Sequence, residues 1–294
     1  MLSFESDSFT INEAHNGDAL AVRPHLIAAF DGVSSENGNG AEARDDFLEL
    51  IDSGKSVEEA IQGLIQKQRY ATTMALAKIT PENELKIYRI GDSRVRVHDE
   101  NGKLVYQTSD QNLFGEIKAS LGLVSAFYEQ PNDQIFADIM EHPELRKKFE
   151  TTCNDFITDG KTSIFKPAAV RQLLDIMNRP GAYEECMRET TETGTSKTLL
   201  KLLFEQSTEF LNYCLADEES QAFAEPVKTL TPQPGYRIVV GTDGIFAHLK
   251  ESMVTDLVNL RTIRFAIKAL VNEAFRRSRR MVDASGVMAT LASI

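Results

Sequence analysis

Residues 27–32 read IAAFDG, and residues 238–244 read IVVGTDG. Both are apolar runs typical of buried β-strands, and each ends at a carboxylate followed by glycine. A carboxylate at a strand end is held on a rigid element, and the glycine lets a backbone carbonyl approach a ligand closely. Such oxygen donors suit a hard divalent cation. Taken singly, each Asp-Gly pair more often marks a simple turn, so the number of such strand ends is decisive.

Three further acidic residues stand at breaks in the strand pattern. Asp18 precedes an apolar run, Asp92 lies in a GDSR turn, and Asp283 comes just before the last predicted strand. With Asp31 and Asp243 they make five carboxylates beside strand ends. Converging carboxylates repel one another unless divalent cations neutralise them. The sequence therefore predicts a metal cluster if the fold brings these ends together.

The wider pattern predicts a mixed α and β chain with a helical insertion. We expect helices over residues 41–51 and 57–68, the second capped by Ser56 and Glu59. Strands are predicted at 72–79, 85–90, 95–99, 227–230, 236–240 and 287–294, and a long helix at 262–279. The first three strands are expected to form a meander. Prolines punctuate amphipathic stretches at 136–149, 170–177 and 199–211, which predicts an inserted helical subdomain at about 123–226 within a single domain spanning 1–294.

Composition narrows the class of protein. The chain has 294 residues, 42% of them hydrophobic and 26% charged, which is typical of a folded protein. Its 32 basic and 44 acidic residues give a net charge of −12, which disfavours nucleic acid and anionic membranes as partners. Three cysteines without a CxxC pair suggest neither disulfides nor structural zinc, so we expect a cytoplasmic protein. We find no basic leader and no apolar segment of about 18 residues, although export by a route that reads no N-terminal signal stays open.

The order of short motifs resembles the metal-dependent protein serine/threonine phosphatases of type 2C, the PPM family. Seven elements carry the resemblance, along residues 10–122 and 227–294. They are NGDA at 16–19, FDGVSS at 30–35 for the family's DGxGG, ATTMA at 71–75 for its GTTA-like strand, GDSR at 91–94, TSDQ at 108–111 for TxDH, GTDGIF at 241–246 for SDGL, and DAS at 283–285 for DNxT. The GDSR element is identical to that of the family, and the helical insertion is unmatched.

The resemblance implies an α+β fold: a four-layer αββα sandwich of two antiparallel sheets flanked by helices. It also implies two Mg²⁺ or Mn²⁺ ions between the sheets, or three as in some members. The implied ligands are Asp31, Gly32 through its carbonyl, Asp243, Asp283, Asp92 and Asp18. Asp31 would bridge two ions, and Asp18 would orient metal-bound water from the outer shell. Asp31, Asp243 and Asp18 are the implied catalytic residues.

The implied activity is hydrolysis of phosphoserine and phosphothreonine in proteins by a metal-bridging hydroxide. Paired cations clamp phosphate oxygens and lower the pKa of a bound water to about 7. A phosphoprotein is therefore the expected substrate. The helical insertion is a candidate docking site for a further protein partner, although its apolar stripes are more simply the core of its own small unit.

Several positions depart from the family pattern. Gly17 stands where an acidic residue is usual, Ser34 and Ser35 replace a glycine pair, and we find no upstream arginine at the spacing of the family's phosphate-binding residue. His15 is the nearest candidate for substrate binding, although a surface histidine is the simpler interpretation. These departures support a second hypothesis, a catalytically weak or inactive pseudophosphatase that acts as a protein-binding module.

Two further alternatives concern the end of the chain. The last motif can be aligned so that Val282, not Asp283, takes the metal position, and we favour Asp283. The basic run RRSRR at 276–280 is most simply a solvated helix end, where cations offset the helix dipole, although one arginine could reach substrate phosphate.

Other phosphate chemistries lack the residues they need. A haloacid dehalogenase-type phosphatase would require aspartates at Ala29 or Gly241, and none of the three cysteines is followed six residues later by arginine. The GTSKT stretch at 194–198 lacks the spacing of a phosphate-binding loop.

Overall fold

The computed structural model divides into two compact units. It describes residues 1–11, 17–32, 39–108, 142–158, 174, 178, 181, 214–216, 218–246, 249, 251–277 and 284–293. One unit comprises Met1–Ser109 and Tyr213–Ile294, and the other comprises Asp110–Asn212. The second unit contributes helix α5 (Pro143–Thr158) to the described residues.

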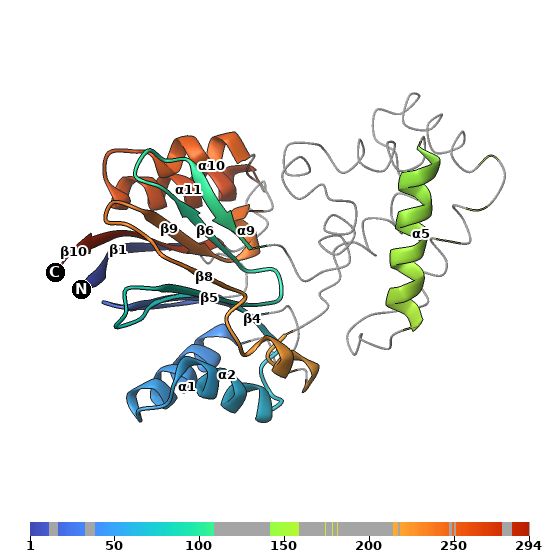
Figure 1. Cartoon of the computed structure of the whole chain (residues 1–294), viewed down its shortest axis with the longest axis horizontal. Helices are drawn as coiled ribbons and strands as arrows, with labels where there is room; N and C mark the ends of the chain where they lie inside the picture. The colour runs from blue at the N-terminus through green and yellow to red at the C-terminus, as the bar shows by residue number, and fades with distance from the viewer. Residues whose placement is uncertain are drawn as a thin grey trace. The chain divides into compact units, whose positions relative to one another are not determined.

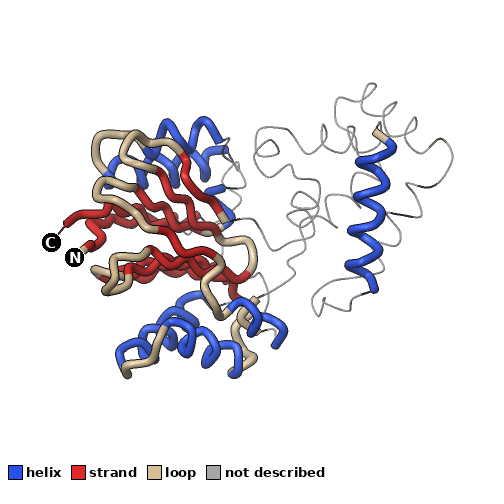
Figure 2. The backbone as a smooth tube through the Cα atoms, viewed as in Figure 1, coloured by secondary structure: helices blue, strands red, loops and turns tan. Residues whose placement is uncertain are grey.

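The first unit contains two five-stranded antiparallel sheets (Figures 1 and 2). The order in one sheet is β1 (Leu2–Ile11), β10 (Ala284–Ser293), β9 (Arg237–Gly241), β6 (Arg94–His98) and β7 (Leu104–Gln107). The order in the other is β2 (Ala19–Arg23), β3 (Leu26–Gly32), β4 (Thr72–Ile79), β5 (Leu85–Ile90) and β8 (Lys228–Leu230).

Helices cover the outer face of each sheet. The β1–β7 sheet is covered by α9 (Asp243–Phe246), α10 (Glu251–Val258) and α11 (Ile263–Arg277), and the β2–β8 sheet by α1 (Gly40–Asp52) and α2 (Val57–Gln66), next to the short η1 (Glu218–Phe223) (Figure 1). The predicted α+β fold, an αββα sandwich, is thereby confirmed.

The apolar runs of the sequence become central strands with both faces buried. In β3, Ile27 and Ala29 face the opposite sheet, while Ala28 and Phe30 pack beneath the helices. This follows from the two-residue period of a strand, which sends successive side chains to opposite faces. The core between the sheets therefore holds β3 and β9 rigidly up to the ends where their carboxylates begin.

Local signals place the helices close to where the sequence predicts them. Helix α2 begins with the predicted capping box, because the Ser56 hydroxyl accepts from the Glu59 amide at 3.1 Å and the Glu59 carboxylate accepts from the Ser56 amide at 2.8 Å. Helix α1 begins at the N-cap Asn39, whose side chain accepts from the Glu42 amide.

The predicted meander over residues 72–99 is wrong in its third strand. β4 and β5 form a hairpin, but β6 crosses to the other sheet and lies between β9 and β7. Gly91 redirects the chain with a φ of +88°, a conformation that favours glycine. Both faces of β6 are buried, as suits a central strand. The crossing is held by a 2.7 Å hydrogen bond between the buried hydroxyls of Thr73 and Ser93.

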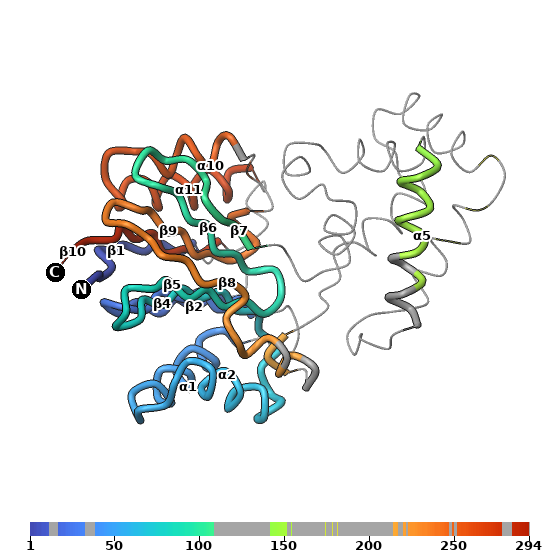
Figure 3. Tube along the Cα trace, in the orientation of Figure 1, coloured from blue at the N-terminus to red at the C-terminus, as the bar shows by residue number. Residues whose placement is uncertain are grey.

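The first strand, β1, was not predicted from the sequence. β1 pairs with β10 in continuous antiparallel register from Leu2 opposite Ser293 to Ile11 opposite Ala284. Figure 3 shows the two strands side by side. β10 also begins three residues earlier than predicted, at Ala284.

The insertion is described only in part. The predicted stretch 136–149 overlaps α5, whereas those at 170–177 and 199–211 lie outside the described residues apart from Leu174. Leu215 belongs to the first unit, where its amide donates to the Thr72 carbonyl at 2.9 Å. The single domain with its inserted helical subdomain stays a prediction. Within the described residues, no helix is long and apolar enough to span a membrane.

Replacement of Gly40 should test how tightly the chain is packed beside the carboxylate strands. A Cβ there would lie 2.3 Å from the Gly17 carbonyl oxygen and 2.6 Å from that of Phe30. Both are backbone atoms, and the Gly17 carbonyl is fixed by the amides of Gly32 and Gly40 at 3.1 and 2.8 Å. We expect Gly40→Ala to lower the free energy of unfolding by about 1–3 kcal/mol or more, as overpacking does, measured by urea denaturation.

The matched control is Gly63→Ala within α2. Its Cβ would meet only the flexible Leu50 side chain, at 3.1 Å, and alanine favours the helix by about 1 kcal/mol. We expect it to remain within about 1 kcal/mol of the parent. Equal losses in the two variants would contradict the packing assigned to Gly40.

Candidate metal centre

Three carboxylates meet at one end of the sandwich. Asp31 lies at the end of β3, Asp92 in the turn between β5 and β6, and Asp243 at the start of α9, directly after β9. Each offers a carboxylate oxygen, and these atoms all lie within 4.8 Å of one another. The group draws on both sheets, because β3 and β9 belong to different ones.

Strand register explains how residues so distant in sequence converge. Asp31 pairs with Thr73 across β3 and β4, and the Thr73 hydroxyl contacts Ser93, the neighbour of Asp92. Arg94, at the start of β6, pairs with Gly241 at the end of β9. The GDSR turn is thereby fixed to the strand ends that carry Asp31 and Asp243.

Thr242 joins the two sheets at this end. Its hydroxyl donates to Asp18 Oδ2 at 3.1 Å and accepts from the Ser285 amide at 3.2 Å, while its own amide donates to the Ser285 carbonyl at 3.0 Å. Thr242 is fully buried and Asp18 nearly so. Thr242 had no predicted role of its own, although it lies within the TDG motif.

Burial and mutual repulsion disfavour the ionised form of the carboxylates at this site. Burial raises the pKa of Asp18 to about 6, and the charge of Asp243 adds to the shift. Burial also raises the pKa of Asp31 well above its usual range, and the nearby charges of Asp243, Asp18 and Asp92 raise it further. A divalent cation would relieve both effects, and a donor set of carboxylate oxygens fits Mg²⁺ or Mn²⁺.

The structure does not place every residue named from the sequence. His15 and Asp283 lie outside the described residues, so their roles stay predictions, as does that of the Gly32 carbonyl. Arg276 and Arg277, in the basic run, each donate a hydrogen bond to Oε1 of Glu273, both at 2.7 Å. Arg94 of the GDSR turn is buried, with its guanidinium carbon 5.8 Å from the centre of the Phe246 ring.

Several solved structures with the same architecture are protein phosphatases. MsPP, a PPM Ser-Thr phosphatase from Mycobacterium smegmatis solved with cacodylate, matches with a TM-score of 0.58 and 14% identity over 97% of each chain. The catalytic domain of the serine/threonine protein phosphatase PstP, solved with two manganese ions, matches with a TM-score of 0.58 and 12% identity over 100% of each chain. The chain has the fold of the PPM phosphatases.

The PPM fold is also shared by Stp1, a serine/threonine phosphatase from Staphylococcus aureus, with a TM-score of 0.55 and 14% identity over 99% of this chain and 96% of that one. No family model and no curated protein sequence matches the chain. The likeness to the PPM fold thus lies in three-dimensional structure, together with the motifs quoted above.

Thr242 offers a direct test of how Asp18 is positioned. Thr242→Val removes a hydroxyl that donates to the buried Asp18 carboxylate, and the loss of such a hydrogen bond costs about 1–3 kcal/mol. We expect Mn²⁺ affinity, measured by calorimetry at pH 7, to fall about tenfold in Thr242→Val. The control Thr242→Ser keeps the hydroxyl and should stay within about threefold of the parent. Equal affinity in all three proteins would exclude this role.

The raised pKa of Asp18 gives a stability profile with a defined sign. Its pKa is about 6 in the folded chain and about 3.9 in an unfolded one, so between pH 4 and 6 the folded state retains a proton that the unfolded state releases. Without divalent cations, the stability of the parent relative to Asp18→Asn should therefore fall as the pH rises through this window.

Thermal denaturation with and without Mn²⁺ measures this effect. The cation should raise the melting temperature of the parent more at pH 7 than at pH 5, because protons compete for the same carboxylates at the lower pH. If, without metal, the stability of the parent relative to Asp18→Asn rises with pH between pH 4 and 6, the pKa of Asp18 is not raised in the folded chain.

Proposed function

We propose that this chain is a metal-dependent protein phosphatase that hydrolyses phosphoserine and phosphothreonine. The observation that carries the proposal is the convergence of the Asp31, Asp92 and Asp243 carboxylates within 4.8 Å at the sheet ends of a PPM fold. The presence of two manganese ions in PstP supports Mn²⁺ as one candidate cofactor, with Mg²⁺ as the other.

The bound cations would supply positive charge that polarises the phosphate oxygens and lowers the pKa of water. Asp31, Asp92 and Asp243 would hold them, with Asp283 and the Gly32 carbonyl as further ligands and two or three ions in all. Asp18, kept in place by the Thr242 hydroxyl, would orient the attacking water. Water attacks phosphorus in line, the bond between phosphorus and the serine or threonine oxygen breaks, and that oxygen takes up a proton.

The remaining parts of the proposal concern the wider chain. Residues 1–294 would act as one phosphatase-like domain, with a phosphoprotein as substrate and the insertion at about 123–226 available to a protein partner. His15 would contact substrate phosphate. A cytoplasmic location is part of the proposal, supported by three cysteines that show no CxxC pair.

Hydrolysis of p-nitrophenyl phosphate and of a phosphothreonine peptide with Mn²⁺ tests the activity. We expect activity in the parent, its loss with a chelator, and a fall in kcat/KM of about 100-fold or more in Asp243→Asn, since even partners of metal ligands contribute 10- to 100-fold. The matched control is Asp256→Asn, which changes an exposed carboxylate on α10 and should leave kcat/KM within about twofold.

The opposite outcomes are equally informative. Activity that survives both the chelator and Asp243→Asn would refute metal-dependent catalysis. A parent protein that is inactive on both substrates, while still folded and able to bind Mn²⁺, would favour the alternative of a pseudophosphatase that acts as a protein-binding module.

A further inference from the structure

Two glycines lie next to each other on the outer face of the β1–β7 sheet, at the end that carries the metal centre. Gly286 on β10 pairs with Gly241 on β9, and Arg94 on β6 pairs with Gly241 from the other side. All three residues face outward, because the valine that neighbours each of them along its strand belongs to the core between the sheets. Two positions without side chains therefore lie beside a long one.

The single turn of α9 packs on these glycines. A Cβ at Gly241 would lie 2.9 Å from Ile245 Cδ1 and 3.1 Å from Phe246 Cε2, and a Cβ at Gly286 would lie 2.6 Å from Ile245 Cδ1. Ile245 and Phe246 are both buried. A helix of four residues is too short to be stable by itself, so the packing of these two side chains holds the turn in place.

The Phe246 ring also contacts two buried arginines on β6. The guanidinium carbons of Arg94 and Arg96 lie 5.8 and 5.9 Å from the centre of the ring. Attraction between a guanidinium group and an aromatic ring is larger where water is excluded, as it is for these side chains. Arg94 follows Asp92 by two residues, and Phe246 follows Asp243 by three. The ring therefore joins the segment that carries Asp92 to the segment that carries Asp243.

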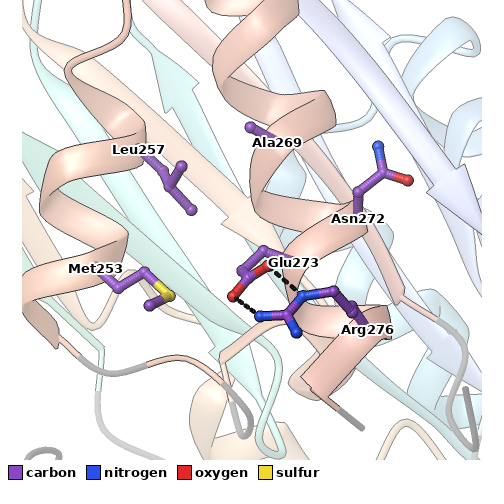
Figure 4. Close-up of a pocket in the computed structure, with 6 residues that line it drawn as sticks. All are labelled: Met253, Leu257, Ala269, Asn272, Glu273 and Arg276. Carbon is purple, nitrogen blue, oxygen red and sulfur yellow. Dashed lines mark hydrogen bonds and ion pairs between the residues drawn. The ribbon is translucent and has the colours of Figure 1, made fainter. Parts of the chain in front are cut away.

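Helices α10 and α11 cover this part of the sheet. Phe246 belongs to the same apolar cluster as Val254 on α10 and Ile267 on α11. Figure 4 shows a groove of about 350 Å³ between these two helices, into which Met253 and Leu257 of α10 project. The described residues that line the groove belong to α10 and α11, so the contacts of the Phe246 ring with β6 and β9 are separate from it.

Backbone pairing supports two of the carboxylates unequally. Asp31 pairs with Thr73 inside the ladder of β3 and β4, whereas the residue pairs of β9 end at Gly241, two residues before Asp243. The direction of the Asp243 side chain thus depends on the turn that follows the strand. Phe246, as the last residue of that turn, is in a position to fix it.

We propose that Phe246 is a positioning residue of the metal centre, which fixes Asp243 relative to Asp92. Its ring is held over Gly241 by the two arginines, and the turn of α9 is held with it. The inference rests on the proposed function, since it assumes that these carboxylates bind cations. Groups that orient metal ligands from outside contribute strongly to metal affinity, so a variant without the ring should bind cations more weakly.

Mn²⁺ affinity, measured by calorimetry at pH 7, tests this role. Phe246→Leu keeps an apolar side chain but lacks the ring, and we expect the affinity to fall about tenfold, as on loss of a partner of a metal ligand. The matched control is Phe4→Leu, the same exchange at another buried position, where Phe4 pairs with Leu291 far along β10 from Gly286. Both variants should lose stability in urea, but Phe4→Leu should bind Mn²⁺ within about twofold of the parent.

A second variant tests the contact from the arginine side. Arg96→Met keeps a long side chain but removes the guanidinium group, and we expect Mn²⁺ affinity to fall about threefold or more. The double variant of Phe246→Leu and Arg96→Met should bind about as well as Phe246→Leu alone, because both changes break the same contact. If circular dichroism shows that Phe246→Leu does not fold, Arg96→Met decides alone, and an unchanged affinity would then overturn the inference.

Three results with folded variants overturn the inference: Phe246→Leu binds Mn²⁺ as the parent does, Phe4→Leu loses as much affinity, or the effects of Phe246→Leu and Arg96→Met add in full. A parent that binds no Mn²⁺ overturns it together with the metal centre. A parent that binds Mn²⁺ but hydrolyses neither p-nitrophenyl phosphate nor the phosphothreonine peptide refutes the proposed activity, while the expected order of affinities would still support the role of Phe246.

Discussion

Mutual repulsion among carboxylates that the fold forces together is the constraint on which this structure depends. Asp31 is brought close to Asp92 and Asp243 at the point where burial already disfavours negative charge. Such an arrangement opposes folding unless protons or cations neutralise it, because every approach of like charges raises the energy of the ionised form. The rest of the sandwich can be understood as the rigid frame that holds these groups in place.

That frame acts through the backbone as much as through the core. The Gly17 carbonyl accepts from two amides, those of Gly32 and Gly40, and so anchors the segments that carry Asp18 and Asp31. Thr242 then connects Asp18 to the opposite sheet. Apolar packing between the sheets fixes the strands, and these few polar contacts fix the last residues beyond them, where packing alone leaves the direction of a side chain open.

Much of the fold could be predicted from the sequence. The elements that could not be predicted depend on contacts between residues that are distant in sequence. Uninterrupted apolar runs such as residues 27–30 identify central strands, and the capping box at Ser56 identifies the start of α2, because both signals are local. The exchange of β6 into the other sheet could not be predicted, since it depends on pairing with β9, far away in sequence. β1 was missed because only part of it alternates in burial and its partner is β10.

At the site, the acidic residues could be predicted from the sequence, but the hydrogen bonds that hold them could not. The motif order identified Asp31, Asp92 and Asp243, whereas the function of the Thr242 hydroxyl emerges only when Asp18 and Ser285 are brought to it by tertiary structure. The exposure of Phe265 on α11 had no signal in the sequence, because this residue cannot be distinguished from a core residue until its face of the helix is known.

The pairing of β1 with β10 also bears on how the protein is made. On the ribosome, residues 2–11 emerge before the other described elements, but the strand that completes their ladder is synthesised last among those elements. At ~5–20 residues per second, the delay is roughly 15 to 55 seconds. Because Ser285 belongs to that late strand, the polar network around Thr242 cannot close during elongation. The nascent chain therefore carries an unpaired strand edge while the residues between β1 and β10 are made, and exposed edges of this kind favour aggregation unless chaperones cover them.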